Sequence, residues 1–146
     1  MDLLDRARTL AACPLFEALA PAVVVRLAER GRVREVAPGE TCSSEEHVWI
    51  VASGALAVTA HGAVDALASI GTRRARGTAA EAGGALGMIR VVSPATPPVS
   101  AYATEPTVLV GLTLDDVRDV LEEDPTALAA LAEAVAALLL REAGSP

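Results

Sequence analysis

The chain has 146 residues, a length that suits one domain built around a single modest core. Its formal net charge is −7, and because nucleic-acid binders usually carry a basic face, we expect no nucleic-acid partner. Hydrophobic residues make up 52% of the chain but 31 residues are alanine, which buries little area, so the core must depend on leucine, valine and isoleucine.

The first 31 residues are predicted to form two helices. Between positions 2 and 12, leucine and alanine recur at the three- and four-residue spacing of one helix face. Pro21 suits the first turn of the second helix, because its missing N–H would have no partner there, and Gly31 suits the end of that helix.

Positions 32–113 instead show the short apolar runs and glycine turns of β-structure. A strand at 33–36 precedes a tight turn, a loop is expected over 41–47, and His61-Gly62 suits a hairpin. Several short strands separated by such turns predict a small β-roll, or jelly roll. The further expected strands cover residues 48–51, 56–60, 64–70, 99–102 and 107–112.

Residues 114–143 are predicted to form two further helices, with Thr113 and Asp124 suited to cap their first turns. The last helix carries leucine and valine at alternating three- and four-residue steps among alanines. This apolar stripe either packs on the chain's own roll or contacts a protein partner or a second copy in a homodimer, and the sequence leaves both open. Its residues are Leu128, Leu131, Val135 and Leu138.

Four short motifs along the chain are similar to those of a known family. They are Pro14-Leu15-Phe16 with Leu19-Ala20-Pro21, the turn Pro38-Gly39-Glu40, the run Val48-Trp49-Ile50-Val51 that leads to Gly54, and Thr113-Leu114-Asp115-Asp116. In this order they resemble the cyclic-nucleotide-binding domain family over nearly the whole chain. The resemblance implies an α+β fold with a single domain, 1–146, in which a cyclic-nucleotide-binding-like β-roll (32–113) is flanked by N-terminal (1–31) and C-terminal (114–143) helices.

Residues 87–101 hold the frame of the family's ligand cassette without its two charged residues. The family has Gly-Glu-x-Ala-Leu-Leu and then Pro-Arg-Ser-Ala, in which the Glu holds the ribose hydroxyl and the Arg holds the cyclic phosphate. Aligned on Gly87, the Glu position is Met88 and the Arg position is Pro97. A phosphate that enters a partly buried site needs such compensation. The resemblance therefore implies a cassette at Gly87, Met88, Arg90, Pro97 and Val99 that no longer binds cAMP or cGMP.

Two groups of arginines leave anion binding open. A short helix is expected to begin at Gly87, and its first N–H groups would attract an anion whose charge Arg90 would help to compensate; the alternative is that Arg90 is a solvated surface residue. Arg73, Arg74 and Arg76 lie in a glycine-flanked insertion, where they either dock an acidic partner or a phosphate, or belong to a soluble loop without a binding role.

The sequence offers no catalytic or metal-binding set. His47 and His61 lack the spacing of a metal site, and no Walker or dinucleotide motif is present. We therefore expect no enzyme activity, no metal and no cofactor. Cys13 and Cys42 are too few for a disulfide framework and favour the cytoplasm. The apolar run 127–140 is too short to cross a bilayer, so we expect no membrane partner.

The expected function is a non-catalytic regulatory or protein–protein interaction module that keeps the family's scaffold and has lost its ligand. The alternative is a small-molecule sensor that still binds a cyclic nucleotide or another anionic ligand through altered contacts. The two differ in whether the region around Gly87 is an open pocket or is filled by Met88 and Val92.

Overall fold

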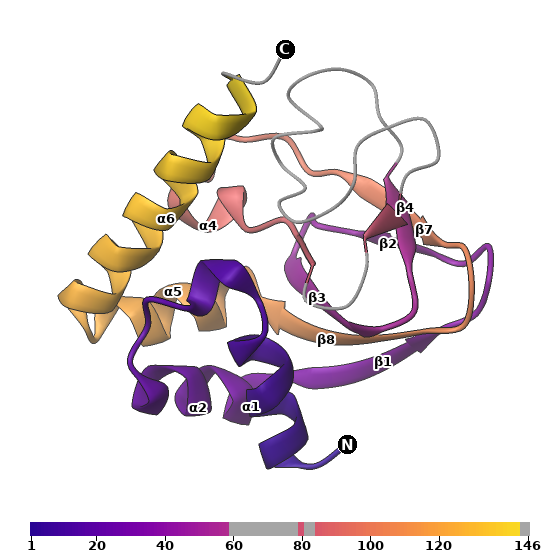
Figure 1. Ribbon diagram of the computed structural model, residues 1–146, viewed down its shortest axis with the longest axis horizontal. Coiled ribbons are helices and arrows are strands. Elements are labelled where there is room, and N and C mark those ends of the chain that lie inside the picture. Colours follow the sequence, from indigo (N-terminus) through magenta and orange to yellow (C-terminus); the bar gives the residue numbers. More distant parts are fainter. Residues whose placement is uncertain (59–78, 81–83, 144–146) are drawn as a thin grey trace.

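Helices stand at both ends of the chain, and the strands lie between them with one short helix (Figure 1). The computed structural model describes residues 1–58, 79–80 and 84–143. The expected turn at His61-Gly62, the strand at 64–70 and the arginine-rich insertion lie outside the described residues. The described helices are α1 (Leu3–Ala11), the 3₁₀ helix η1 (Pro14–Phe16), α2 (Pro21–Arg30), α4 (Ile89–Val92), α5 (Leu114–Glu122) and α6 (Pro125–Ala143).

The strands of the described chain pair into two antiparallel sheets. They are β1 (Arg32–Val36), β2 (Thr41–Ser43), β3 (His47–Ser53), β4 (Leu56–Val58), β5 (Ala79–Ala80), β6 (Ala85–Leu86), β7 (Ser100–Ala103) and β8 (Thr107–Thr113). One sheet has the order β1-β8-β3-β6 and the other the order β2-β7-β4-β5. The predicted α+β class, a roll with helices on both sides of it in sequence, is confirmed.

The starts of the C-terminal helices follow from capping chemistry. The hydroxyl of Thr113 accepts a hydrogen bond from the backbone N–H of Asp116 at 3.0 Å and caps α5. The carboxylate of Asp124 accepts from the backbone N–H of Ala127 at 3.2 Å in the first turn of α6. Pro125 suits that turn because it has no N–H that would need a partner. Both predicted caps are confirmed.

The loop predicted over 41–47 is wrong in its first half, because β2 lies there. Thr41 pairs with Tyr102 and Ser43 with Ser100 on β7. Only the central residue of β2, Cys42, is buried. Three residues are too few for a strand period to be recognised in the sequence, so this segment resembles a loop.

The sheet β1-β8-β3-β6 separates two apolar cores, because alternate residues of a strand face opposite ways. Val48 and Ile50 of β3 lie in the helical core, which joins one face of this sheet to the buried sides of the helices. Trp49 and Val51 lie in the roll core between the two sheets. The roll core consists of Val36, Cys42, Trp49, Val51, Leu56, Leu86, Val99, Ala101, Ala103 and Leu109.

Candidate ligand site

Gly87 fixes the start of the cassette segment, residues 87–101, against the turn between β2 and β3. Its φ is +92°, a conformation that side-chain-bearing residues rarely adopt. A Cβ at this position would lie 2.7 Å from the Cβ of Ser44 and 3.2 Å from the carbonyl oxygen of His47. The glycine therefore permits both the backbone turn and the close approach of two segments that are distant in sequence.

Met88, at the position of the family's carboxylate, is fully buried in the helical core. Leu86, two residues earlier in the sequence, lies in the roll core instead. The side chain of Met88 is thus on the helix side of the sheet. Val92, the other residue expected to fill this region, is only half-buried and packs against the same helical core.

Pro97 and Val99, the other two apolar cassette positions, differ in burial. Pro97 is exposed and, as a proline, provides neither a side-chain donor nor a backbone N–H. Val99 is buried in the roll core. Its N–H donates to the hydroxyl of Ser44 at 2.8 Å, and its carbonyl accepts from the N–H of Ser44 at 2.9 Å. Near its C-terminal end, the cassette segment is therefore hydrogen-bonded to the β2–β3 turn through two bonds between Val99 and Ser44.

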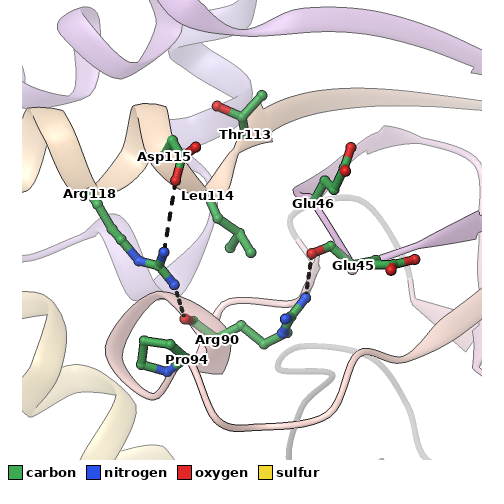
Figure 2. A pocket seen from close by; sticks show the side chains of 8 residues that line it. All are labelled: Glu45, Glu46, Arg90, Pro94, Thr113, Leu114, Asp115 and Arg118. Carbon is green, nitrogen blue, oxygen red and sulfur yellow. Dashed lines mark hydrogen bonds and ion pairs between the residues drawn. The ribbon is translucent and has the colours of Figure 1, made fainter.

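Arg90 is half-buried, and its guanidinium donates hydrogen bonds to backbone carbonyls instead of extending freely into solvent. Its Nη1 donates to the carbonyl oxygens of Ser44 and Glu45, both at 2.6 Å. Its Nε donates to the carbonyl oxygen of Thr96 at 3.0 Å. Figure 2 shows the side chain reaching from α4 toward Glu45. Because all three acceptors are backbone atoms, which every residue has, the sequence contains no pattern from which these hydrogen bonds could be predicted.

A cavity of about 510 Å³ lies beside Arg90, at the start of α5. Arg118 of α5 donates from Nη2 to the carbonyl oxygen of Arg90 at 3.0 Å, and its Nη1 lies 3.9 Å from the carboxylate of Asp115 (Figure 2). The sequence did not point to Arg118 as part of this region. The cavity is lined by Glu45, Glu46, Arg90, Pro94, Thr113, Leu114, Asp115 and Arg118.

The interior of the roll is apolar in the described part of the chain. Of the residues whose burial the structure describes, Ser44 and Thr107 are the buried polar residues, and none is charged. Burial raises the pKa of the Cys42 thiol from 9.0 to about 11, which leaves it neutral at physiological pH. Burial also raises the pKa of Cys13. An anion placed among the described roll-core side chains would meet no compensating charge.

His47 belongs to a group of three contacting side chains, two from β3 and one from β1. Its ring lies 4.9 Å from that of Trp49, and the guanidinium carbon of Arg34 lies 5.3 Å from the same indole. Within the residues that the structure describes, no three His, Cys, Asp or Glu side chains are grouped to hold a metal ion. His61 and the three arginines of the insertion lie outside those residues.

The predicted interaction stripe on α6 divides into buried and exposed positions. Leu131 and Val135 are buried in the helical core, so these two pack on the chain itself. Leu128 is 37% exposed. The side chain of Leu138 lies outside what the structure describes. Alanines and Leu140 add to the exposed surface of the same helix.

Solved structures share this arrangement at low sequence identity. A candidate cyclic nucleotide-binding protein from Geobacter metallireducens GS-15 matches with a TM-score of 0.69 and 17% identity, over 93% of this chain and 96% of that one. The sensor domain of the transcriptional regulator DNR from Pseudomonas aeruginosa matches with a TM-score of 0.65 and 17% identity, over 98% and 95%. The chain has the cyclic-nucleotide-binding fold.

This fold is also found in the N-terminal domain of a transcriptional regulator from Streptomyces coelicolor A3(2), which matches with a TM-score of 0.65 and 19% identity over 91% of both chains. The resemblance inferred from the sequence motifs is thereby confirmed at the level of the fold. No protein-family model matches the sequence, and no curated protein matches it. In the described residues, no helix combines the length and the apolar character that crossing a membrane requires.

Proposed function

We propose that this chain is a single non-catalytic domain, 1–146, that has lost ordinary cAMP and cGMP binding and acts in the cytoplasm through protein–protein contact. Two proteins that share its fold are a sensor domain and an N-terminal domain of transcriptional regulators. This structural similarity supports a regulatory role rather than a catalytic one. The cassette is then a structural remnant that holds the roll to the helices.

The engagement of Arg90 is the observation that carries this proposal. Its guanidinium already donates to three carbonyl oxygens, and Pro97 has no donor to offer. Met88 lies in the helical core and has no oxygen with which to accept from a ribose hydroxyl. Removing one partner of a buried charge pair costs about 2–5 kcal/mol, which is more than tenfold in affinity. Ordinary cyclic-nucleotide affinity is therefore not expected.

Thermal unfolding with added nucleotide tests the proposal. At about 1 mM ligand, a site with a dissociation constant of about 10 µM stabilises the folded state by about 2.7 kcal/mol. For a chain of this length that corresponds to a rise in Tm of roughly 5–10 °C. We expect cAMP, cGMP and cyclic dinucleotides each to raise the Tm by less than about 1 °C. A saturable shift, confirmed by calorimetric titration, would contradict the loss of binding.

A sensor for another anionic ligand is the second candidate, because Arg118 borders the cavity of about 510 Å³, although Glu45, Glu46 and Asp115 line it as well. A ligand there would contact α5 rather than the interior of the roll. If an anion does raise the Tm, the variant Arg118→Met distinguishes binding in this cavity from binding elsewhere on the chain. Loss of the shift in this variant supports the sensor, whereas an unchanged shift excludes this cavity.

The surface proposed for protein contact is the exposed side of α6, and its occupant is a second copy of the chain or a regulatory partner. It presents leucines at the two ends of a row of alanines. Alanine side chains let a second helix approach closely at little loss of side-chain entropy. The exposed residues of this surface are Leu128, Ala129, Ala132, Glu133, Ala136, Ala137 and Leu140.

A further inference from the structure

Arg90 joins two segments that are about 45 residues apart in the sequence. Its acceptors on the β2–β3 turn are the carbonyls of Ser44 and Glu45, and its acceptor within the cassette segment is the carbonyl of Thr96. Hydrogen bonds from a charged donor are stronger than those between neutral groups. The side chain therefore holds the turn and the cassette segment together across their shared edge.

Arg118 joins the same cassette segment to α5. Its Nη2 donates to the carbonyl of Arg90 at 3.0 Å, while its ion pair with Asp115 is long, at 3.9 Å, and the Asp115 side chain is 94% exposed. The Nε of Arg118 is buried without a hydrogen-bond partner. A buried donor without an acceptor is costly. The unpaired N–H raises the free energy of this closed arrangement, which lowers the cost of opening it.

The two contacts lie in series around the cavity at the start of α5 (Figure 2). The side chain of Arg90 bonds the turn, and the backbone of the same residue accepts from Arg118. A separate hydrogen bond links the start of α5 directly to the β2–β3 turn, since the N–H of Leu114 donates to the carbonyl of Glu46 at 3.0 Å. The turn, the cassette segment and α5 are thus linked pairwise.

We propose that Arg90 and Arg118 form a latch that makes the β2–β3 turn, the cassette segment and the start of α5 open and close together. Both arginines are positioning residues in this latch. Loosening α5 releases the carbonyl of Arg90, and the displaced α4 then withdraws the guanidinium from the turn. The latch requires no bound ligand and does not depend on the proposed loss of nucleotide binding.

Hydrogen exchange of the full chain, measured by mass spectrometry, tests the latch. The informative variant is at Arg118, which bonds the cassette segment but not the β2–β3 turn, so a change at the turn must be transmitted. Arg118→Met should speed amide exchange at residues 44–46 by about tenfold, and Arg90→Met should do the same at residues 114–118. Arg30→Met is the control, because Arg30 also pairs with α5, through Asp116, but from the side of α2. We expect it to leave exchange at 44–46 unchanged.

The double variant separates the latch from the direct link between Leu114 and Glu46. In the Arg90→Met background, Arg118→Met should add no further exchange at 44–46, since the series is already broken. An equal increase in both backgrounds would assign the coupling to the direct link and overturn the latch, as would an unchanged turn in Arg118→Met alone. If Arg90→Met fails to fold, Arg90→Lys takes its place and should give the same pattern at about threefold.

Discussion

At the scale of single residues, Gly87 combines two demands that alanine cannot meet. Its φ of +92° is strained for any residue with a Cβ, and the Cβ would also overlap Ser44. We expect Gly87→Ala to lower the free energy of unfolding by about 2–4 kcal/mol, the sum of backbone strain and overpacking. Urea denaturation followed by circular dichroism measures this loss as a lower midpoint.

Gly39→Ala is the matched control for that experiment. Gly39 has a similar φ, +87°, but a Cβ there would have no neighbour within 4 Å. Only the backbone term remains, and we expect a loss of about 1–2 kcal/mol. An equal decrease in the free energy of unfolding in both variants would mean that the β2–β3 turn moves aside at no cost. The close contact between position 87 and Ser44 would then contribute nothing to stability.

The sequence predicted a glycine turn at Gly87, and its positive φ confirms that turn. It did not predict what the segment after the turn contacts. The role of Arg90 could not be predicted, since its three acceptors are backbone carbonyls and two of them are about 45 residues away. Arg118 was missed for the same reason, because its acceptor is the carbonyl of Arg90.

At the scale of elements, the helices were easier to predict than the strands. Pro21, Thr113 and Asp124 mark helix starts through local chemistry. In the structure α2 begins at Pro21, and α5 and α6 begin directly after Thr113 and Asp124. The strands β2, β5 and β6 have two or three residues each, too few for a period to appear. Their pairing is decided by contacts with β3, β4 and β7 rather than by their own sequence.

The exposed side of α6 gives the prediction that belongs to this scale. Leu140 is 73% exposed near the end of a helix of 19 residues. If this side forms a homodimer, Leu140→Glu should weaken self-association by at least about tenfold, because a carboxylate would be buried in an apolar contact. Sedimentation velocity over a range of concentrations measures the change. Thermal stability of the monomer should stay within about 0.5 kcal/mol.

Leu4→Glu provides the comparison for the α6 variant. Leu4 is 56% exposed on α1, so the substitution makes the same change in charge at an exposed leucine away from α6. Association that falls equally in both variants would indicate a general effect of charge. A wild-type chain that stays monomeric at all concentrations would rule out the homodimer and leave α6 to a different partner.

At the scale of the whole molecule, the sheet β1-β8-β3-β6 serves as the common wall of two cores. Val110 and Leu112 of β8 lie in the helical core, while Leu109 lies in the roll core. Because both cores pack on this one sheet, loss of the sheet exposes the side chains of both cores to water. The helices and the roll are therefore expected to unfold in one cooperative step, as single domains of this size usually do.

Trp49 allows that cooperativity to be measured without labelling, since it is the chain's one tryptophan. Its side chain lies in the roll core and its indole N–H donates to the carbonyl of Ser43 at 2.8 Å, so its fluorescence reports the roll. Circular dichroism at 222 nm reports the helices.

We expect the urea transitions measured by tryptophan fluorescence and by circular dichroism to coincide. Leu131→Ala, on the far side of the sheet in the helical core, should lower both midpoints together by the equivalent of about 2–5 kcal/mol. A fluorescence midpoint that stays in place while the helical signal moves would show that the shared sheet does not couple the two cores.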